Sequence, residues 1–314
     1  MIQTVTGKIE NKSLGKALIH EHISCASNDL IKAFGKTWLD RDSLEDYASD
    51  TLSLLKEKYN LGLFVDGTPI DLGRDAILLK NTSLKSGMPI VASTGFYLFK
   101  TLGVLGTEEN ELADLLIYEC TKGMEGTDVK PGILKCATVY SGLNTETLRK
   151  HAAVGITQKE TGLPVYVHCE HNENVVFDQI DILKKYGANP EKLVIGHTAH
   201  RPSADYLESV LKTGCYISID QCHCFPDRLT EIAESVLSLC KKGYGDKILI
   251  SGDLCIHNDF AARKTNGLHL DKFEQAKRFG YMFDKLYCEF LAVGGNPADW
   301  EKMTEQNPYQ VLDV

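Results

Sequence analysis

The sequence has no long hydrophobic run: none of its apolar stretches approaches the roughly 18 residues that a membrane-spanning helix needs. Its first residues show no basic segment followed by an apolar one, so we expect no signal peptide. Basic residues are few, with 34 Lys and Arg against 43 Asp and Glu, and the net charge of −9 disfavours binding to nucleic-acid phosphates. These absences argue against a membrane protein and a nucleic-acid-binding protein, and they predict an acidic protein of the cytoplasm.

Nucleotide-binding motifs are absent as well. No G-x-G-x-x-G follows an early strand-like segment, and no P-loop occurs. Low-complexity tracts and linkers are also lacking, so we expect a single domain that spans residues 1–314.

The ten cysteines do not form a pattern typical of disulfides. Six of them lie inside apolar or periodic segments, where a free thiol acts as a small hydrophobic side chain, and this is typical of a reducing compartment. Cys222-His223-Cys224 could hold a metal, but no second Cys/His pair lies at zinc-finger spacing. We interpret this triplet as a loop with incidental thiols rather than a structural zinc site.

What the sequence does contain is a regular alternation of short apolar runs and longer segments with helical periodicity. The apolar runs are continuous, as in parallel strands that are buried on both faces. Strands are predicted at residues 17–22, 61–67, 89–95, 132–139, 164–168, 193–197, 215–220 and 248–253. Helices are predicted at residues 43–59, 73–86, 108–123, 145–162, 174–186, 203–213, 227–242 and 271–293, with a last short segment at 299–312.

Eight strand–helix repeats predict an α/β fold, a single (β/α)₈ TIM barrel, which typically takes about 250 residues. Residues 1–16 form a short lead-in, either a hairpin or a cap below the barrel. The alternative is a doubly wound open sheet, which has no nucleotide-binding motif to support it here.

Two histidines stand at the end of the first predicted strand, in Ala17-Leu18-Ile19-His20-Glu21-His22. Side chains at i and i+2 of a strand point to the same face, so both imidazoles converge on one point. Paired imidazoles suit a metal ion.

Further polar side chains recur at the ends of later strands, where a barrel carries its active site. They are Lys135, His168, His197 and Asp253, and the steps between them are 33, 29 and 56 residues, close to one, one and two strand–helix units. A charged amine inside the apolar strand around Lys135 is costly unless it is paired or neutralised. Carboxylation by carbon dioxide would convert Lys135 into an anionic ligand that bridges two cations, so the set predicts a two-metal site.

These motifs resemble the phosphotriesterase family of the amidohydrolase superfamily, which includes phosphotriesterase-like lactonases. The resemblance extends from "GKALIHEHI" through "GILKCAT", "VYVHCE", "VIGHT" and "LISGDL" to "EQNPYQVL". It implies that His20, His22, Lys135 and Asp253 hold a buried metal, and that carboxylated Lys135, His168 and His197 hold an exposed one. Zinc is the expected metal, with manganese, cobalt and iron left open.

The resemblance also implies hydrolysis by a metal-bridging hydroxide, with Asp253 as the proton acceptor. Gly95-Phe96-Tyr97 is similar to the Gly-x-Tyr of the lactonase branch, so Tyr97 is expected to donate a hydrogen bond near the reacting oxygen. Two departures weaken a triesterase interpretation. After His197 the organophosphate enzymes carry an aspartate in a proton relay, and here the matching stretch is Thr198-Ala199-His200-Arg201. After the seventh strand the family often has His or Arg directly after an aspartate, and here the pair is Asp220-Gln221. We expect a lactonase with at most promiscuous phosphotriesterase activity.

Several basic residues fall on loops predicted to lie at the mouth. They are His200, Arg201, His223, Arg228, Arg263 and Lys264. Arginine pairs suit phosphate or carboxylate groups, so an anionic small-molecule substrate such as a sugar lactone phosphate is one hypothesis, against the alternative of solvated loop charges. Two alternatives to a lactonase stay open: an amidase or N-acyl amino acid deacylase, and a non-catalytic metal-bearing binding protein. The family resemblance also implies a homodimer.

Overall fold

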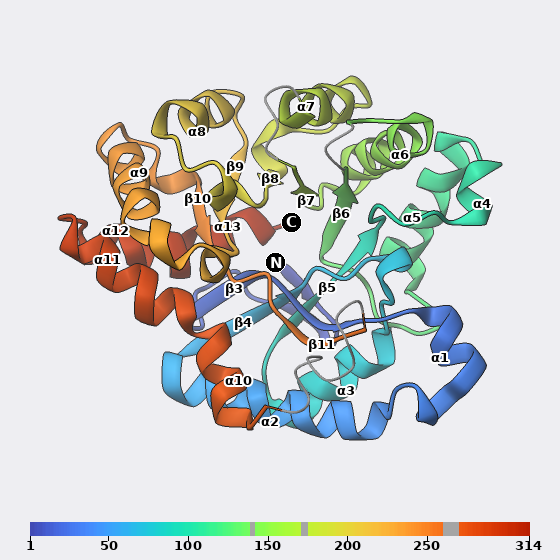
Figure 1. Cartoon of the computed structure of the whole chain (residues 1–314). Helices are drawn as coiled ribbons and strands as arrows, with labels where there is room; N and C mark the ends of the chain where they lie inside the picture. Colours follow the sequence, from blue (N-terminus) through green and yellow to red (C-terminus); the bar gives the residue numbers. More distant parts are fainter. Residues whose placement is uncertain (139–141, 171–174, 260–269) are drawn as a thin grey trace.

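The computed structural model describes residues 1–138, 142–170, 175–259 and 270–314. In it, nine parallel strands form one curled sheet with helices around the outside (Figure 1). Eight consecutive strands lie side by side in chain order, from β3 to β10, and β11 adds on next to β3. The strands are β3 (Lys16–Cys25), β4 (Leu61–Asp66), β5 (Ile90–Gly95), β6 (Ile133–Ala137), β7 (Val165–His168), β8 (Leu193–Ile195), β9 (Tyr216–Ile219), β10 (Ile248–Ile250) and β11 (Cys255–Asn258).

The helices follow the strands in the order that the sequence predicts. The bounds are α1 (Asn28–Phe34), α2 (Arg41–Tyr59), α3 (Ala76–Ser86), α4 (Leu102–Leu105), α5 (Glu109–Lys122), α6 (Thr145–Thr161), α7 (Val175–Lys185), α8 (Ala204–Leu211), α9 (Leu229–Lys241), α10 (Lys272–Phe279), α11 (Tyr287–Ala292), α12 (Pro297–Glu301) and α13 (Asn307–Leu312). The sequence pattern did not predict α1 or α4. It also predicted one helix at 271–293, where a π-helical segment, Met282–Leu286, joins α10 to α11.

The last barrel strand consists of two pieces, and this is how the sheet closes. β10 pairs with β9, whereas β11, only five residues further on, pairs with β3. Between them, the backbone N–H of Asp253 donates to the carbonyl of His20, and the N–H of His22 donates to the carbonyl of Leu254, both at 2.9 Å. The first and last strands therefore meet, and the predicted (β/α)₈ barrel is confirmed.

The lead-in is a hairpin of two antiparallel strands, β1 (Ile2–Thr4) and β2 (Gly7–Ile9). The side chain of Ile2 is fully buried in the hydrophobic cluster that fills the barrel, together with residues of α13. The hairpin and the C-terminal helix therefore cover the amino-terminal end of the barrel and leave the carboxyl end free for a site.

Burial within β3 shows how this strand delivers its histidines. Ala17 and Ile19 belong to the cluster inside the barrel, whereas Leu18 packs outward against the helices. The pairing with β4 shifts register between Leu18 and Glu21. A bulge of this kind re-aims side chains, and here it lets His20 follow Ile19 into the interior.

No helix in the described ranges is both long enough and apolar enough to cross a membrane. All ten cysteines are free, in agreement with the prediction that the sequence contains no disulfide framework.

Candidate metal centre

A cavity of about 190 Å³ lies at the carboxyl end of the barrel. Five of the six predicted metal ligands line it, and so do Tyr97 and two cysteines. The lining residues are His20, His22, Cys25, Leu72, Tyr97, Lys135, His168, Gln221, Asp253, Cys255 and Asn258.

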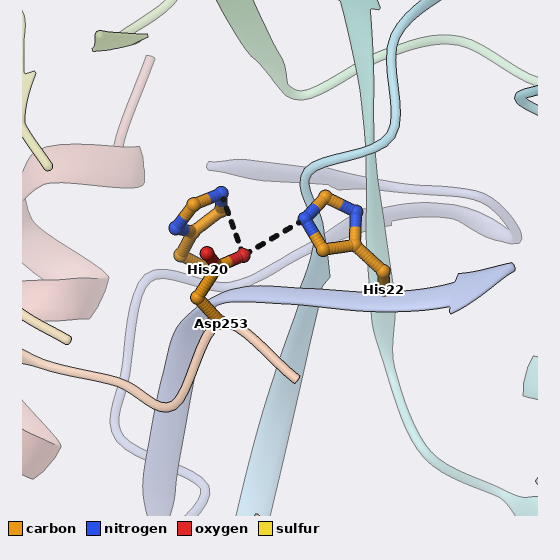
Figure 2. A group of neighbouring side chains, drawn as sticks. All are labelled: His20, His22 and Asp253. Atoms are coloured by element: carbon orange, nitrogen blue, oxygen red, sulfur yellow. Dashed lines mark hydrogen bonds and ion pairs between the residues drawn. The ribbon is translucent and has the colours of Figure 1, made fainter. Parts of the chain in front are cut away.

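Three of the predicted ligands form one tight group. One ligand atom from each of His20, His22 and Asp253 lies within 4.8 Å of the others. Asp253 Oδ1 lies 3.5 Å from His20 Nε2 and 3.1 Å from His22 Nε2. Figure 2 shows the Asp253 carboxylate between the two imidazole rings, with both contacts drawn as dashed lines. Lys135 Nζ is 2.5 Å from His20 Nε2, so the lysine belongs to the same group.

The other two predicted ligands adjoin this group. His168 Nδ1 and His197 Nε2 are 2.6 Å apart, and His197 Nδ1 lies 3.7 Å from Asp253 Oδ2. His197 and Asp253 both have positive φ angles, 59° and 53°. Such left-handed backbone at strand ends is uncommon outside glycine and is concentrated at functional sites. The structure thus brings all six predicted ligands together.

In His20 and in His22, the ring nitrogen that points away from Asp253 makes a hydrogen bond of its own. His20 Nδ1 lies 3.2 Å from the carboxylate of Asp220, which can only accept, so the proton is on Nδ1 and Nε2 carries a lone pair. His22 Nδ1 lies 2.8 Å from the hydroxyl of Thr68, which itself donates to the carbonyl of Ser24. His22 Nε2 lies 3.1 Å from Asp253 Oδ1, a carboxylate oxygen that can only accept, so Nε2–H donates to it. The Nε2 atoms of His20 and His22 and the carboxylate of Asp253 are ligand types that a divalent cation takes.

Burial keeps Lys135, His20 and His168 neutral, whereas at His197 the nearby carboxylate of Asp220 outweighs burial and raises the pKa. The pKa of Lys135 is lowered because the amine is buried, and burial lowers the pKa of His20 to about 3. A neutral amine is the form that reacts with carbon dioxide, so Lys135 also fits the expected carboxylated ligand. Burial alone would raise the pKa of Asp253, but the neighbouring His20, His22 and His197 hold that pKa well below its usual range. Asp253 is therefore a carboxylate at neutral pH.

Asp220 contacts a histidine of each predicted metal site, although in the sequence it stands out only as part of a departure from the family pattern. Its side chain is fully buried at the end of β9. It accepts hydrogen bonds from His20 Nδ1, from the backbone N–H of His197 at 2.9 Å and from the hydroxyl of Tyr166. His197 Nδ1 also lies 3.1 Å from it. One carboxylate thus orients a histidine of each expected metal site.

Glu21 was missed as well, although it stands between the two histidines. Its buried carboxylate accepts from Ser251 Oγ at 2.8 Å, Gly252 N at 2.5 Å and Leu254 N at 2.7 Å. It therefore holds the turn that carries Asp253. A Cβ at Gly252 would lie 2.9 Å from Glu21 Oε1, so a larger residue there would displace this carboxylate.

Tyr97 lies at the rim, with its ring edge-to-face against His168 at a centroid separation of 5.0 Å. Burial raises the pKa of Tyr97, so its phenol stays protonated and is a hydrogen-bond donor. Its backbone N–H donates to Asp71 at 2.5 Å, and its carbonyl accepts from Lys150 at 3.1 Å. The predicted catalytic tyrosine is thus held by a buried ion pair that the sequence analysis did not identify.

Gln221 occupies the position directly after Asp220. Its side-chain amide donates to Asp253 Oδ2, and its oxygen lies 2.5 Å from His200 Nε2. Its φ of 57° turns this amide toward the cavity. His200 therefore contacts the site through Gln221 and does not line the cavity itself.

The other predicted substrate-binding residues that the structure describes lie outside the cavity lining. Arg201 stacks on the ring of Tyr206 at 4.2 Å, and Arg228 pairs with Glu231 at 2.9 Å. His223 lies in a short turn, beside the exposed thiol of Cys224. Arg263 and Lys264 lie outside the described residues. In the described part of the chain, Cys222, His223 and Cys224 do not belong to any group of three close metal-binding side chains.

A (β/α)₈ barrel with histidines and a carboxylate gathered at the carboxyl ends of its strands is the architecture of a metal-dependent hydrolase. The chain belongs to the phosphotriesterase family, whose model matches residues 1–312. The recognition of that family from the sequence motifs is confirmed.

Curated relatives agree with this assignment. The chain is 30% identical to an aryldialkylphosphatase of Saccharolobus solfataricus and 28% identical to a phosphotriesterase homology protein of Mycobacterium tuberculosis, in each case over 82% of both chains. It is 25% identical to an N-acetyltaurine hydrolase of Rattus norvegicus over 99% of this chain and 97% of that protein. The prediction that the protein is a hydrolase is thereby confirmed.

Proposed function

We propose that the protein is a binuclear metal-dependent lactonase that acts on a small lactone. The observation that carries this proposal is the contact between Asp253 and Gln221. The carboxylate of Asp253 lies among the expected metal ligands, and the group that contacts its Oδ2 is the amide of Gln221. An amide neither gains nor loses a proton at neutral pH.

His20, His22, Lys135 and Asp253 would hold one metal ion, and carboxylated Lys135, His168 and His197 the other. When bound, two such ions supply hydroxide at neutral pH and polarise the acyl oxygen. Zinc is the expected ion, since its usual ligands are imidazole and carboxylate groups.

Proton transfer by Asp253 favours a lactone over an aryl phosphotriester. Attack of hydroxide on an acyl carbon releases a proton, and Asp253 is the partly exposed carboxylate in the cavity wall that can accept it. The leaving group of a lactone is an alkoxide that must be protonated and stays tethered to the product, so Asp253 can return the proton to it directly. An aryloxide leaves without a proton, and the proton must then pass to solvent, which the amide of Gln221 cannot mediate.

Tyr97 contributes a protonated phenol at the edge of the same cavity. Such a donor can orient the ring oxygen of a lactone beside Asp253. The cavity of about 190 Å³ is small and matches a small ring better than a bulky triester.

Metal analysis combined with a substrate panel tests the proposal. We expect two metal ions per chain and hydrolysis of simple lactones, with much slower turnover of aryl phosphotriesters. Lys135→Met, which cannot be carboxylated, is expected to lower both the metal content and the turnover, whereas Lys159→Met on the surface is the matched control. Two bound metals with no lactone turnover would contradict the assignment.

The panel includes phosphorylated and unphosphorylated forms of each lactone. Within the described residues no arginine lines the cavity. A preference for the phosphorylated form would therefore indicate a contribution from Arg201, Arg228 or the basic pair Arg263 and Lys264.

A second candidate is the hydrolysis of N-acyl amino acids or related amides. It is favoured by the N-acetyltaurine hydrolase of Rattus norvegicus, which aligns over 99% of the chain. An amine leaving group also needs a proton, so Asp253 would serve it equally well. Comparing kcat/KM for lactones and N-acyl amino acids distinguishes the two reactions.

A further inference from the structure

Two cysteines from opposite ends of the sequence meet in the cavity. Cys25 ends β3 and Cys255 begins β11, and their Sγ atoms lie 3.4 Å apart. Both thiols are free, and both line the cavity together with His22 and Asp253. The proposed hydrolysis uses neither of them.

The strand geometry disfavours a direct disulfide between them. A disulfide needs an S–S distance of about 2.05 Å and Cα atoms about 4.4–6.8 Å apart. The parallel register pairs Cys25 with Asn258 and Cys255 with His22, so the two cysteines are not direct cross-strand partners. Oxidation to a disulfide would have to bring the Sγ atoms from 3.4 Å to about 2.05 Å, which requires both residues to move.

A single bridging atom needs no such movement. Two sulfurs 3.4 Å apart, each bonded to one atom at about 2.3 Å, subtend an angle of about 95°. This angle is narrower than the tetrahedral angle that zinc favours, and it suits a pyramidal trivalent centre with three bonds.

We propose that Cys25 and Cys255 form a dithiol site that captures a trivalent arsenical at the mouth of the cavity. For an aryl arsenoxide, two As–S bonds form, two S–H bonds break, and the oxygen leaves with both protons as water. No electron is transferred, so the reaction needs no oxidant or reductant.

The position of the site determines its effect. The bridged arsenic occupies the cavity next to His22 and Asp253, so its organic substituent fills the space that a substrate would enter. The protein is then inhibited without loss of its metal ions. Capture itself does not depend on the proposed lactonase activity.

The test uses phenylarsine oxide at one equivalent with the full-length, metal-loaded protein. Native mass spectrometry is expected to show one phenylarsenic group per chain with unchanged metal content. Cys25→Ser and Cys255→Ser should each abolish the adduct. Cys224→Ser, which removes an exposed thiol elsewhere, should retain it.

A mapping experiment on the wild-type protein removes any dependence on variant folding. The loaded protein is unfolded in denaturant without competing thiol and alkylated. Cys25 and Cys255 should both be protected, and 2,3-dimercaptopropanol, but not the monothiol glutathione, should release the arsenic. Protection of a different pair, an adduct that survives both serine substitutions, or no adduct would overturn the proposal.

Loss of lactone turnover in the loaded protein is the functional readout. If the protein has no lactonase activity, the adduct and its mapping still decide whether the dithiol site exists. An adduct on these two cysteines that leaves hydrolysis unchanged would refute the inhibitory role alone.

Discussion

The ammonium group of Lys150 in α6 lies 3.0 Å from the carboxylate of Asp71, and both side chains are almost fully buried. Lys150 also lies 3.1 Å from Glu146 and donates to the carbonyls of Tyr97 and Phe99, at 3.1 and 2.7 Å. One buried cation thus fastens the loop after β5, which carries Tyr97, to α6.

Lys150→Met is expected to destabilise the protein by about 3–5 kcal/mol, because it leaves the largely buried carboxylates of Asp71 and Glu146 without their shared cation. It should also raise KM for a lactone more than it lowers kcat, because Tyr97 loses its fixed position. Urea unfolding and steady-state kinetics measure the two effects. Arg149→Met, one residue earlier and partly exposed, is the matched control and should cost less than about 1 kcal/mol. Unchanged KM and stability in Lys150→Met would refute the role of Lys150 in holding the loop of Tyr97.

Asp220→Asn is expected to lower metal affinity or turnover by about 10- to 100-fold, since His20 and His197 lose the acceptor that orients them. Competition with a chromogenic chelator measures the affinity. Tyr166→Phe removes one donor to the same carboxylate and leaves both imidazole contacts, so its affinity should stay near that of the wild type. Equal affinities in the two variants would contradict this assignment.

Gln221→Met is expected to reduce kcat for lactones by about tenfold, because Asp253 loses a charge-assisted hydrogen bond at Oδ2. The metal content should stay the same, and KM should change little, because Gln221 acts through Asp253. Gln221→His supplies a side chain that can carry a proton, and it should raise phosphotriester turnover relative to lactone turnover. If Gln221→His lowered both activities equally, the argument based on proton transfer would be wrong.

The buried imidazole of His151 makes stability depend on pH. Burial lowers the pKa of His151 from 6.5 to about 4, and Nε2 lies 3.0 Å from the amide nitrogen of Gln179. Between pH 4 and pH 6.5, His151 is therefore protonated in the unfolded chain and neutral in the folded chain. Its contribution to stability is complete above pH 6.5 and is lost as the pH falls toward 4.

The expected slope from this one group is at most about 1.4 kcal/mol per pH unit. Urea unfolding at pH 7.5 and pH 5 measures it, with His151→Gln as the variant that cannot titrate. The loss of stability on acidification should be smaller in the variant than in the wild type. Because both proteins contain the same other histidines, the difference between the two losses reports on His151 alone. An equal loss in both proteins would rule out His151 as the cause.

Local patterns in the sequence determined the barrel and its six candidate ligands. Strand–helix alternation and the period of two in His20-Glu21-His22 depend only on neighbouring residues, and the carboxyl ends of parallel strands must meet at one face of a barrel. The homodimer and the single domain stay predictions. The resemblance to the phosphotriesterase family could likewise be recognised from short motifs.

Only the tertiary structure decided what surrounds those ligands. Asp220 could not be chosen from sequence as the residue that orients His20, because 200 positions separate them. Cys25 meets Cys255 because the barrel closes between β3 and β11. Lys150 meets the loop of Tyr97 because α6 packs beside it. Sequence periodicity specifies which face a side chain points to, whereas contacts between distant segments depend on the register in which the barrel closes.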